Sequence, residues 1–177
     1  MTEPKNFSDI LKLQEIYEAE VNKPRENGFI ARTKNYVDLR GALMDEFMEF
    51  RRELPYELNF KTWKKKGYSA AKQLEEFTDM LFFIATEINF SSIKNQAVEK
   101  WNFYWEHYET NSGIDISDLH FFMNDICNKE ILVLLEKYIL LAKRIGYTEK
   151  DILQEYWKKW QHNLKDRIEG DWSHEKD

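Results

Sequence analysis

LEEFTDMLFFIA, residues 74–85, carries two carboxylates at positions i and i+3, next to Glu75, inside an otherwise apolar run. These are Glu76 and Asp79, which lie three residues apart and so point the same way from a helix. Apolar residues surround them at helical spacing. The segment therefore predicts a largely buried helix with an acidic pair at the edge of the core.

A second acidic motif comes earlier, where ALMDEFMEF at residues 42–50 carries Glu46 and Glu49. Carboxylates that face one another at a core edge repel strongly and cannot all stay ionised unaided. A divalent cation resolves that conflict, and oxygen-only ligands suit Mg²⁺ or Mn²⁺. The two motifs together predict a metal site formed by Glu46, Glu49, Glu76 and Asp79.

The alternative for either motif alone is a solvated acidic face, the commoner role of acidic helical residues. Two observations favour the metal site. The first pair continues the stripe of Leu39 and Ala42, beside the inward face of its helix rather than opposite it. Asp79 of the second pair is a poor helix former in the middle of an apolar run, so its presence there favours a functional role.

Composition limits the class of protein. With 177 residues, 33% charged and 42% hydrophobic, the chain fits one globular domain over 1–177, with flexible tails expected at about 1–7 and 171–177. The net charge of −6 argues against a general nucleic-acid binder. The single cysteine, Cys127, excludes an internal disulfide and a cysteine-based metal site.

The chain shows no targeting or membrane signal. Its first residues form a charged amphipathic pattern rather than a signal peptide. The longest uncharged apolar stretch, residues 80–86, is far too short to span a bilayer. We expect a cytoplasmic protein that has neither a membrane nor a nucleic acid as its partner.

Helical periodicity runs through almost the whole chain, and no strand pattern or repeat appears. We predict an all-α helical bundle of about six or seven helices. The expected helices cover about 8–21, 35–53, 70–88 and 92–108, a short helix capped by Ser117, one from an Asn128 cap to Arg144, and one from 148 to about Gly170.

Some aromatic residues repeat at helical spacing. Ile16 and Tyr36 are assigned to the inward faces of the first two helices. Trp101, Tyr104, Trp105 and Tyr108 are assigned to packing or to a subunit interface.

Two basic and aromatic segments accompany the acidic motifs: Trp63 to Lys66, and Tyr156 to Trp160. Their lysines fit solvated faces, but beside an acidic metal site they also suit the phosphates of a metal-bound nucleotide.

The order of these motifs resembles that of the all-α nucleoside triphosphate pyrophosphohydrolases, in particular the dimeric dUTPase branch with its dUTPase/dCTPase enzymes. There the first acidic helix is followed by a segment similar to Phe60-Lys-Thr-Trp63, and the second acidic motif reads EExxD, as Glu75 to Asp79 does. The resemblance continues through residues that stand in register, namely Gln14, Tyr156, Lys159, Asn163 and Gly170.

The resemblance implies a homodimer that uses Mg²⁺, or Mn²⁺, to cleave a nucleoside triphosphate, dUTP first of all, to the monophosphate and pyrophosphate. It implies that the four carboxylates hold the metal and that Glu49 accepts a proton from the attacking water. The implied phosphate contacts are Lys64, Lys159, Asn163 and Arg167. The implied base and sugar contacts are Gln14, Trp63 and Tyr156.

The chain departs from the family pattern near its C-terminus. Trp160 stands where the family has Asn, and Asp166 stands where it has Arg, with Arg167 next. These departures leave open a pyrophosphohydrolase for another dNTP such as dCTP, or an altered relative that binds a nucleotide or a protein. A ferritin-like di-iron bundle ranks low, because it needs Glu-x-x-His on two helices and no Glu here has a His three residues later.

Overall fold

A computed structural model describes residues 1–25, 28–110 and 113–165, which form seven helices and no strand. The helices are α1 (Phe7–Val21), α2 (Tyr36–Glu53), α3 (Ala70–Phe90), α4 (Lys94–His107), α5 (Ile116–Asn128), α6 (Ile131–Ile145) and α7 (Glu149–His162). The predicted all-α bundle is thereby confirmed.

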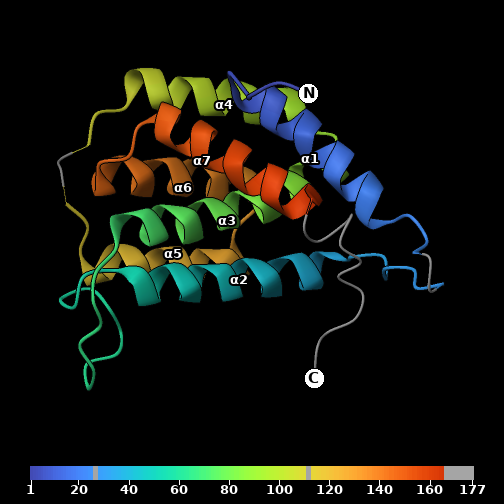
Figure 1. Ribbon diagram of the computed structural model, residues 1–177. Helices are drawn as coiled ribbons and strands as arrows, with labels where there is room; N and C mark the ends of the chain where they lie inside the picture. The colour runs from blue at the N-terminus through green and yellow to red at the C-terminus, as the bar shows by residue number, and fades with distance from the viewer. Residues whose placement is uncertain (26–27, 111–112, 166–177) are drawn as a thin grey trace.

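Helix α3 is the centre of the bundle (Figure 1) and contacts α1, α2, α4, α6 and α7. It also carries the apolar run of residues 74–85, so its burial on several sides follows from the sequence. Its most extensive partner is α2. The two helices meet through aromatic side chains, with the rings of Phe50 and Phe77 5.2 Å apart and Phe77 stacked on Tyr138 of α6 at 4.4 Å.

The helix ends follow local side-chain chemistry. At the start of α2, Asn35 and Asp38 form a capping box in which each side chain accepts the other's backbone N–H. Thr148 and Asp151 start α7 in the same way. Helix α6 ends at Gly146, whose φ of 101° lies in the left-handed region that favours glycine.

Two predicted caps were wrong. Helix α5 is capped by Asp115, which forms a capping box with Asp118, while Ser117 lies inside the first turn and donates to Asp115. Asn128 is the last residue of α5, and its side chain binds the carbonyl oxygen of Asn124. Asp115 and Asp118 each accept the other's backbone N–H, which Ser117, only two residues after Asp115, does not do.

Two predicted inward positions are exposed. Ile16 is 38% exposed because α1 packs on the bundle along one side only, and Tyr36 is 52% exposed at the first turn of α2. The ring of Tyr36 instead lies beside the Arg40 guanidinium, 4.7 Å from its centroid. Trp101 behaves as expected for a packing residue, since it is fully buried and stacks on Phe7 at 4.5 Å.

The expected end of the last helix near Gly170, and the expected tail at 171–177, lie outside the described residues. Among the helices of the described ranges, none is both long and apolar enough to cross a membrane.

Candidate functional site

The acidic motifs meet where α2 and α3 lie side by side. Glu46, Glu49 and Glu76 each bring one carboxylate oxygen to within 4.8 Å of the other two. Helix α2 supplies the first two and α3 the third, so the pairing of two helices creates the group. An all-oxygen set at this spacing fits a hard divalent cation.

The predicted electrostatic conflict is present. Burial, followed by repulsion from Asp79, Glu49 and Glu76, raises the pKa of Glu46 to about 7. Burial and then the charges of Asp79 and Glu49 raise the pKa of Glu76 to about 7 as well. Each group therefore titrates near pH 7 when no cation is bound, and a bound divalent ion would favour the ionised forms.

Lys159 of α7 provides the positive charge of the site. Its Nζ lies 2.8 Å from Asp79 Oδ2 and 2.9 Å from Glu75 Oε1. Burial by itself would lower the pKa of this lysine, but the two carboxylates outweigh that effect and raise it. The hydrogen bond that Lys159 donates to Glu75 lowers the pKa of this glutamate. Lys159 is therefore fixed as a cation at the edge of the acidic group.

A cavity of about 260 Å³ runs from this charged group into the bundle. Its lining residues come from α1, α2, α3, α7 and the segment before α2 and are Gln14, Tyr17, Glu18, Val21, Lys34, Glu46, Asp79, Phe82, Phe83, Thr86, Lys159 and Asn163. One end is acidic and carries Lys159, and the other part has aromatic walls and a second polar group.

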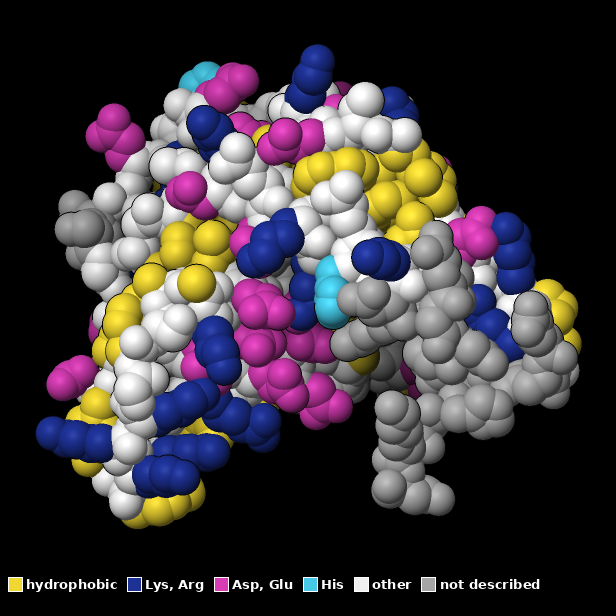
Figure 2. Space-filling view, in the orientation of Figure 1, with side chains coloured by type: hydrophobic (Ala, Val, Ile, Leu, Met, Phe, Trp, Pro, Cys, Tyr) yellow, Lys and Arg dark blue, Asp and Glu magenta, His cyan; other side chains and the backbone are white. Residues whose placement is uncertain are grey.

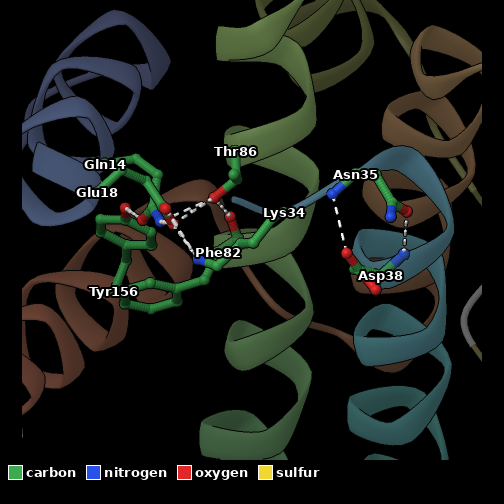
Figure 3. Close-up of polar contacts among 8 residues, drawn as sticks. All are labelled: Gln14, Glu18, Lys34, Asn35, Asp38, Phe82, Thr86 and Tyr156. Carbon is green, nitrogen blue, oxygen red and sulfur yellow. Dashed lines mark hydrogen bonds and ion pairs between the residues drawn. The ribbon is translucent and has the colours of Figure 1, made fainter. Parts of the chain in front are cut away.

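That second polar group joins α1, α3 and α7 (Figure 3). The hydroxyl of Tyr156 donates to Gln14 Oε1 at 2.6 Å, which fixes the orientation of the glutamine amide. Gln14 Nε2 then donates to Thr86 Oγ1 at 2.9 Å and to Glu18 Oε1 at 3.2 Å. Lys34 completes the group, because its Nζ lies 2.8 Å from both oxygens of Glu18.

The structure brings several predicted site residues to this cavity. Gln14, Lys159 and Asn163 line it. Asn163 is 6% exposed, and its Oδ1 has no hydrogen-bond partner among the described residues. Tyr156 is fully buried behind Gln14 rather than in the lining. Their contacts with a nucleotide stay predictions.

The predicted residues of the loop between α2 and α3 lie apart from the cavity. Trp63 is 76% exposed and Lys64 is also exposed, and neither lines the cavity. Figure 2 shows basic side chains gathered over this loop, beside acidic side chains at the middle of the same face. The loop is held by Tyr56, whose hydroxyl donates to the carbonyl oxygen of Thr62 at 2.8 Å. Arg167 lies outside the described residues.

Sequence reasoning missed Glu18, Lys34 and Thr86. A signal existed for Glu18, because it follows Gln14 by four residues and so shares its helix face. No comparable signal existed for Lys34, because its pairing with Glu18 depends on the path of the segment before α2.

Described residues that form helices without strands, and that place clustered carboxylates of two adjacent helices beside a lysine and a cavity, have the make-up of an all-α nucleoside triphosphate hydrolase. A family model described as dUTPase matches residues 6–171. The chain therefore belongs to the dUTPase family and is a dUTPase-like nucleoside triphosphate hydrolase, as its motifs predicted. No curated protein matches the sequence.

Proposed function

We propose that the enzyme uses Mg²⁺ to hydrolyse dUTP to dUMP and pyrophosphate, with Glu46, Glu49, Glu76 and Asp79 at the metal. The observation that supports this most is the grouping of three glutamates within 4.8 Å, one of which, Glu46, also lines the cavity. A metal ion bound there would neutralise the phosphates and lower the pKa of an attacking water.

The protein's own residues would accept a proton from the water and contact the phosphates. Glu49 is the most exposed of the clustered glutamates, at half its side-chain surface, so it is open to a water molecule and would accept its proton. Lys159, buried in an ion pair with Asp79, would turn to a phosphate oxygen when substrate arrives. The unpartnered Oδ1 of Asn163 gives the cavity a further polar contact. Lys64 and Arg167 remain proposed phosphate contacts.

The choice of dUTP rests on the family match and on the size of the cavity. A volume of about 260 Å³ is small for a nucleotide site, since pockets for drug-sized ligands usually measure about 300–1,000 Å³. A single-ring base fits this space better than a purine. Because dCTP also has a single ring, it is the second candidate substrate.

We also propose that the enzyme is a homodimer. Apolar side chains stand exposed on α4 and α5, with Phe121 at 63%, Ile116 at 59% and Phe103 at 52%. Exposed apolar side chains of this size are candidate contacts for a second copy of the chain. Sedimentation or light scattering of the purified protein checks this state.

The test of the activity is pyrophosphate release from each dNTP with Mg²⁺ and with EDTA. We expect turnover with dUTP, loss of turnover with EDTA, and a large loss in Glu49→Gln. Glu99→Gln is the matched control, since Glu99 is an exposed glutamate of α4 away from the cavity. Absence of turnover with every dNTP would refute the proposal, and full activity of Glu49→Gln would refute the role of Glu49.

A further inference from the structure

We propose that Glu75 is a positioning residue for the reaction, which holds the Lys159 ammonium beside the acidic group and is not itself a metal ligand. The inference rests on the proposed function, because Lys159 acts there on a phosphate oxygen. Glu75 belongs to α3 and Lys159 to α7, so the role depends on one contact between two helices.

The two adjacent glutamates of α3 point in different directions. Successive residues of a helix are separated by about 100° around its axis, so Glu75 and Glu76 cannot both face α2. Glu76 joins the group formed with Glu46 and Glu49 of α2. Glu75 instead reaches α7, where its Oε1 accepts a hydrogen bond from Lys159 Nζ at 2.9 Å. The adjacent carboxylates therefore serve two different neighbouring helices.

Asp79 lies between these two directions. It follows Glu75 by four residues and Glu76 by three, which places it about 40° from the first and about 60° from the second around α3. Its Oδ2 lies 2.8 Å from Lys159 Nζ. In the proposed function Asp79 is also a metal ligand, so Lys159 shares this carboxylate with the metal. Glu75 is the partner of Lys159 that the metal does not use.

The side chain of Lys159 is fixed at both of its ends. The next residue, Trp160, is 2% exposed, and its Nε1 donates to the carbonyl oxygen of Leu13 at 2.8 Å, which anchors α7 to α1. Glu75 and Asp79 hold the other end, the ammonium group. A mobile lysine loses rotamer freedom when it binds an anion, whereas a lysine that is already held has lost it beforehand. The contact with Glu75 therefore prepares the cation for a phosphate.

One hydrogen of the ammonium remains for a ligand. Lys159 Nζ carries three hydrogens and uses two of them for Glu75 and Asp79. Lys159 lines the cavity together with Glu46 and Asp79, whereas Glu75 lies outside that lining. Glu75 can thus direct the lysine without occupying the space in which the substrate would lie.

Two other roles of Glu75 lead to different expectations. An ion pair that only ties α3 to α7 would affect stability and leave the binding of ligands unchanged. A further metal ligand would affect the binding of Mg²⁺ itself, as Glu76 should. A positioning residue should affect the binding of phosphates, and only while Lys159 is present.

The experiment compares wild type with Glu75→Ala, Lys159→Met and the double variant. Calorimetry measures the affinity for Mg²⁺ alone and for inorganic tripolyphosphate in the presence of Mg²⁺, so binding is measured independently of dNTP turnover. Glu76→Gln is the reference for a lost metal ligand. Glu99→Ala is the matched control, because Glu99 is an exposed glutamate of α4 away from the cavity. The side chain of Glu75 is 39% exposed and alanine favours helices, so Glu75→Ala should keep the fold.

We expect Glu75→Ala to weaken tripolyphosphate binding about tenfold and to raise KM for the preferred dNTP by a similar factor, because a charge-assisted hydrogen bond is lost. The affinity for Mg²⁺ alone should change less than about threefold, since the removed charge does not touch the ion. In Lys159→Met the further loss should be less than about twofold, because both residues act through one contact. Glu75→Gln keeps an acceptor oxygen for Lys159 and should restore part of the affinity.

A tripolyphosphate affinity of Glu75→Ala equal to that of wild type would overturn the inference, as would an equal loss with and without Lys159. Loss of Mg²⁺ affinity to the extent seen in Glu76→Gln would make Glu75 a metal ligand and contradict the inference too. These outcomes are separate from failure of the proposed function. An enzyme that hydrolyses dNTPs equally well without Glu75 retains the function and loses the inference.

Discussion

Lys159 Nζ binds Asp79 Oδ2 at 2.8 Å, so a lysine of α7 neutralises one of the carboxylates that the sequence assigned to a metal. The three glutamates beside it receive no such ion pair from α7 and carry the repulsion, which appears in the raised pKa values of Glu46 and Glu76. The four acidic groups therefore differ in their partners: Asp79 pairs with Lys159, Glu49 lies 3.7 Å from Arg52 of its own helix, and Glu46 and Glu76 have the raised pKa values.

Removing Lys159 should separate its role from that of a general surface charge. In Lys159→Met we expect kcat/KM to fall by about 100-fold or more, because a fixed cation at the phosphates is lost. Pyrophosphate release measures this change. Lys158→Met is the control, since Lys158 is exposed and pairs with Glu155 of the same helix. Equal effects of the two substitutions would contradict a specific role for Lys159.

Metal binding should stabilise the fold through the clustered glutamates. We expect the Tm of wild type to rise with Mg²⁺ concentration, because a ligand that binds only the native state adds RT ln(1 + [L]/Kd) to its stability. The rise should be much smaller in Glu76→Gln. Differential scanning fluorimetry measures both, with Glu99→Gln as a variant that keeps the full rise. A rise that persists undiminished in Glu76→Gln would place the metal elsewhere.

The metal-free protein should lose stability as the pH increases from about 4.5 to 7. The pKa values of Glu46 and Glu76 are about 7 in the folded state, above the ordinary value of 4.5. Between those values the folded state binds more protons than the unfolded state, so protonation stabilises it and ionisation removes that contribution. Urea unfolding in EDTA at several pH values measures the trend.

The control for this pH dependence is Glu46→Gln, in which one of the two titrating groups is absent and the slope should be smaller. A metal-free stability that increases through the same pH window would contradict the assignment.

Two fully buried tyrosines offer a matched test of the second polar group, in which Tyr156 binds Gln14. Tyr156→Phe removes the hydroxyl that donates to Gln14 and should lower the free energy of unfolding by about 1–3 kcal/mol, because a buried acceptor loses its partner. Tyr138→Phe removes a hydroxyl without a partner among the described residues and should cost less than about 0.5 kcal/mol. Denaturant unfolding measures both, and a larger cost for Tyr138→Phe would refute the comparison.

Much of the acidic cluster could be predicted from the sequence because it depends on short-range order. The spacing of Glu46 and Glu49 is set within one helix, as is that of Glu76 and Asp79, and the apolar runs ensure that both helices pack inward. The family resemblance also predicted Gln14, Lys159 and Asn163 as site residues, and all three line the cavity.

The remaining features depend on contacts between distant segments. Lys34 reaches Glu18 across sixteen residues through the path of a loop, which periodicity does not describe. Trp63 stands exposed on a loop whose shape depends on side-chain to backbone bonds such as that of Tyr56. The cap of α5 was misassigned because Asp115 and Ser117 are both good cap residues, and the partner three positions on decides between them.

Helix α3 carries Glu76 and Asp79 at one point and Thr86 two turns later. This one helix therefore sets the distance between the acidic end of the cavity and the second polar group. The helix therefore fixes the length of the cavity between these two groups. One residue inserted between Asp79 and Thr86 would lengthen it by only 1.5 Å but rotate its far half by about 100°. The acidic group and the polar group around Thr86 would then face different sides of the bundle. The cavity therefore depends on the register of α3 as well as on its length.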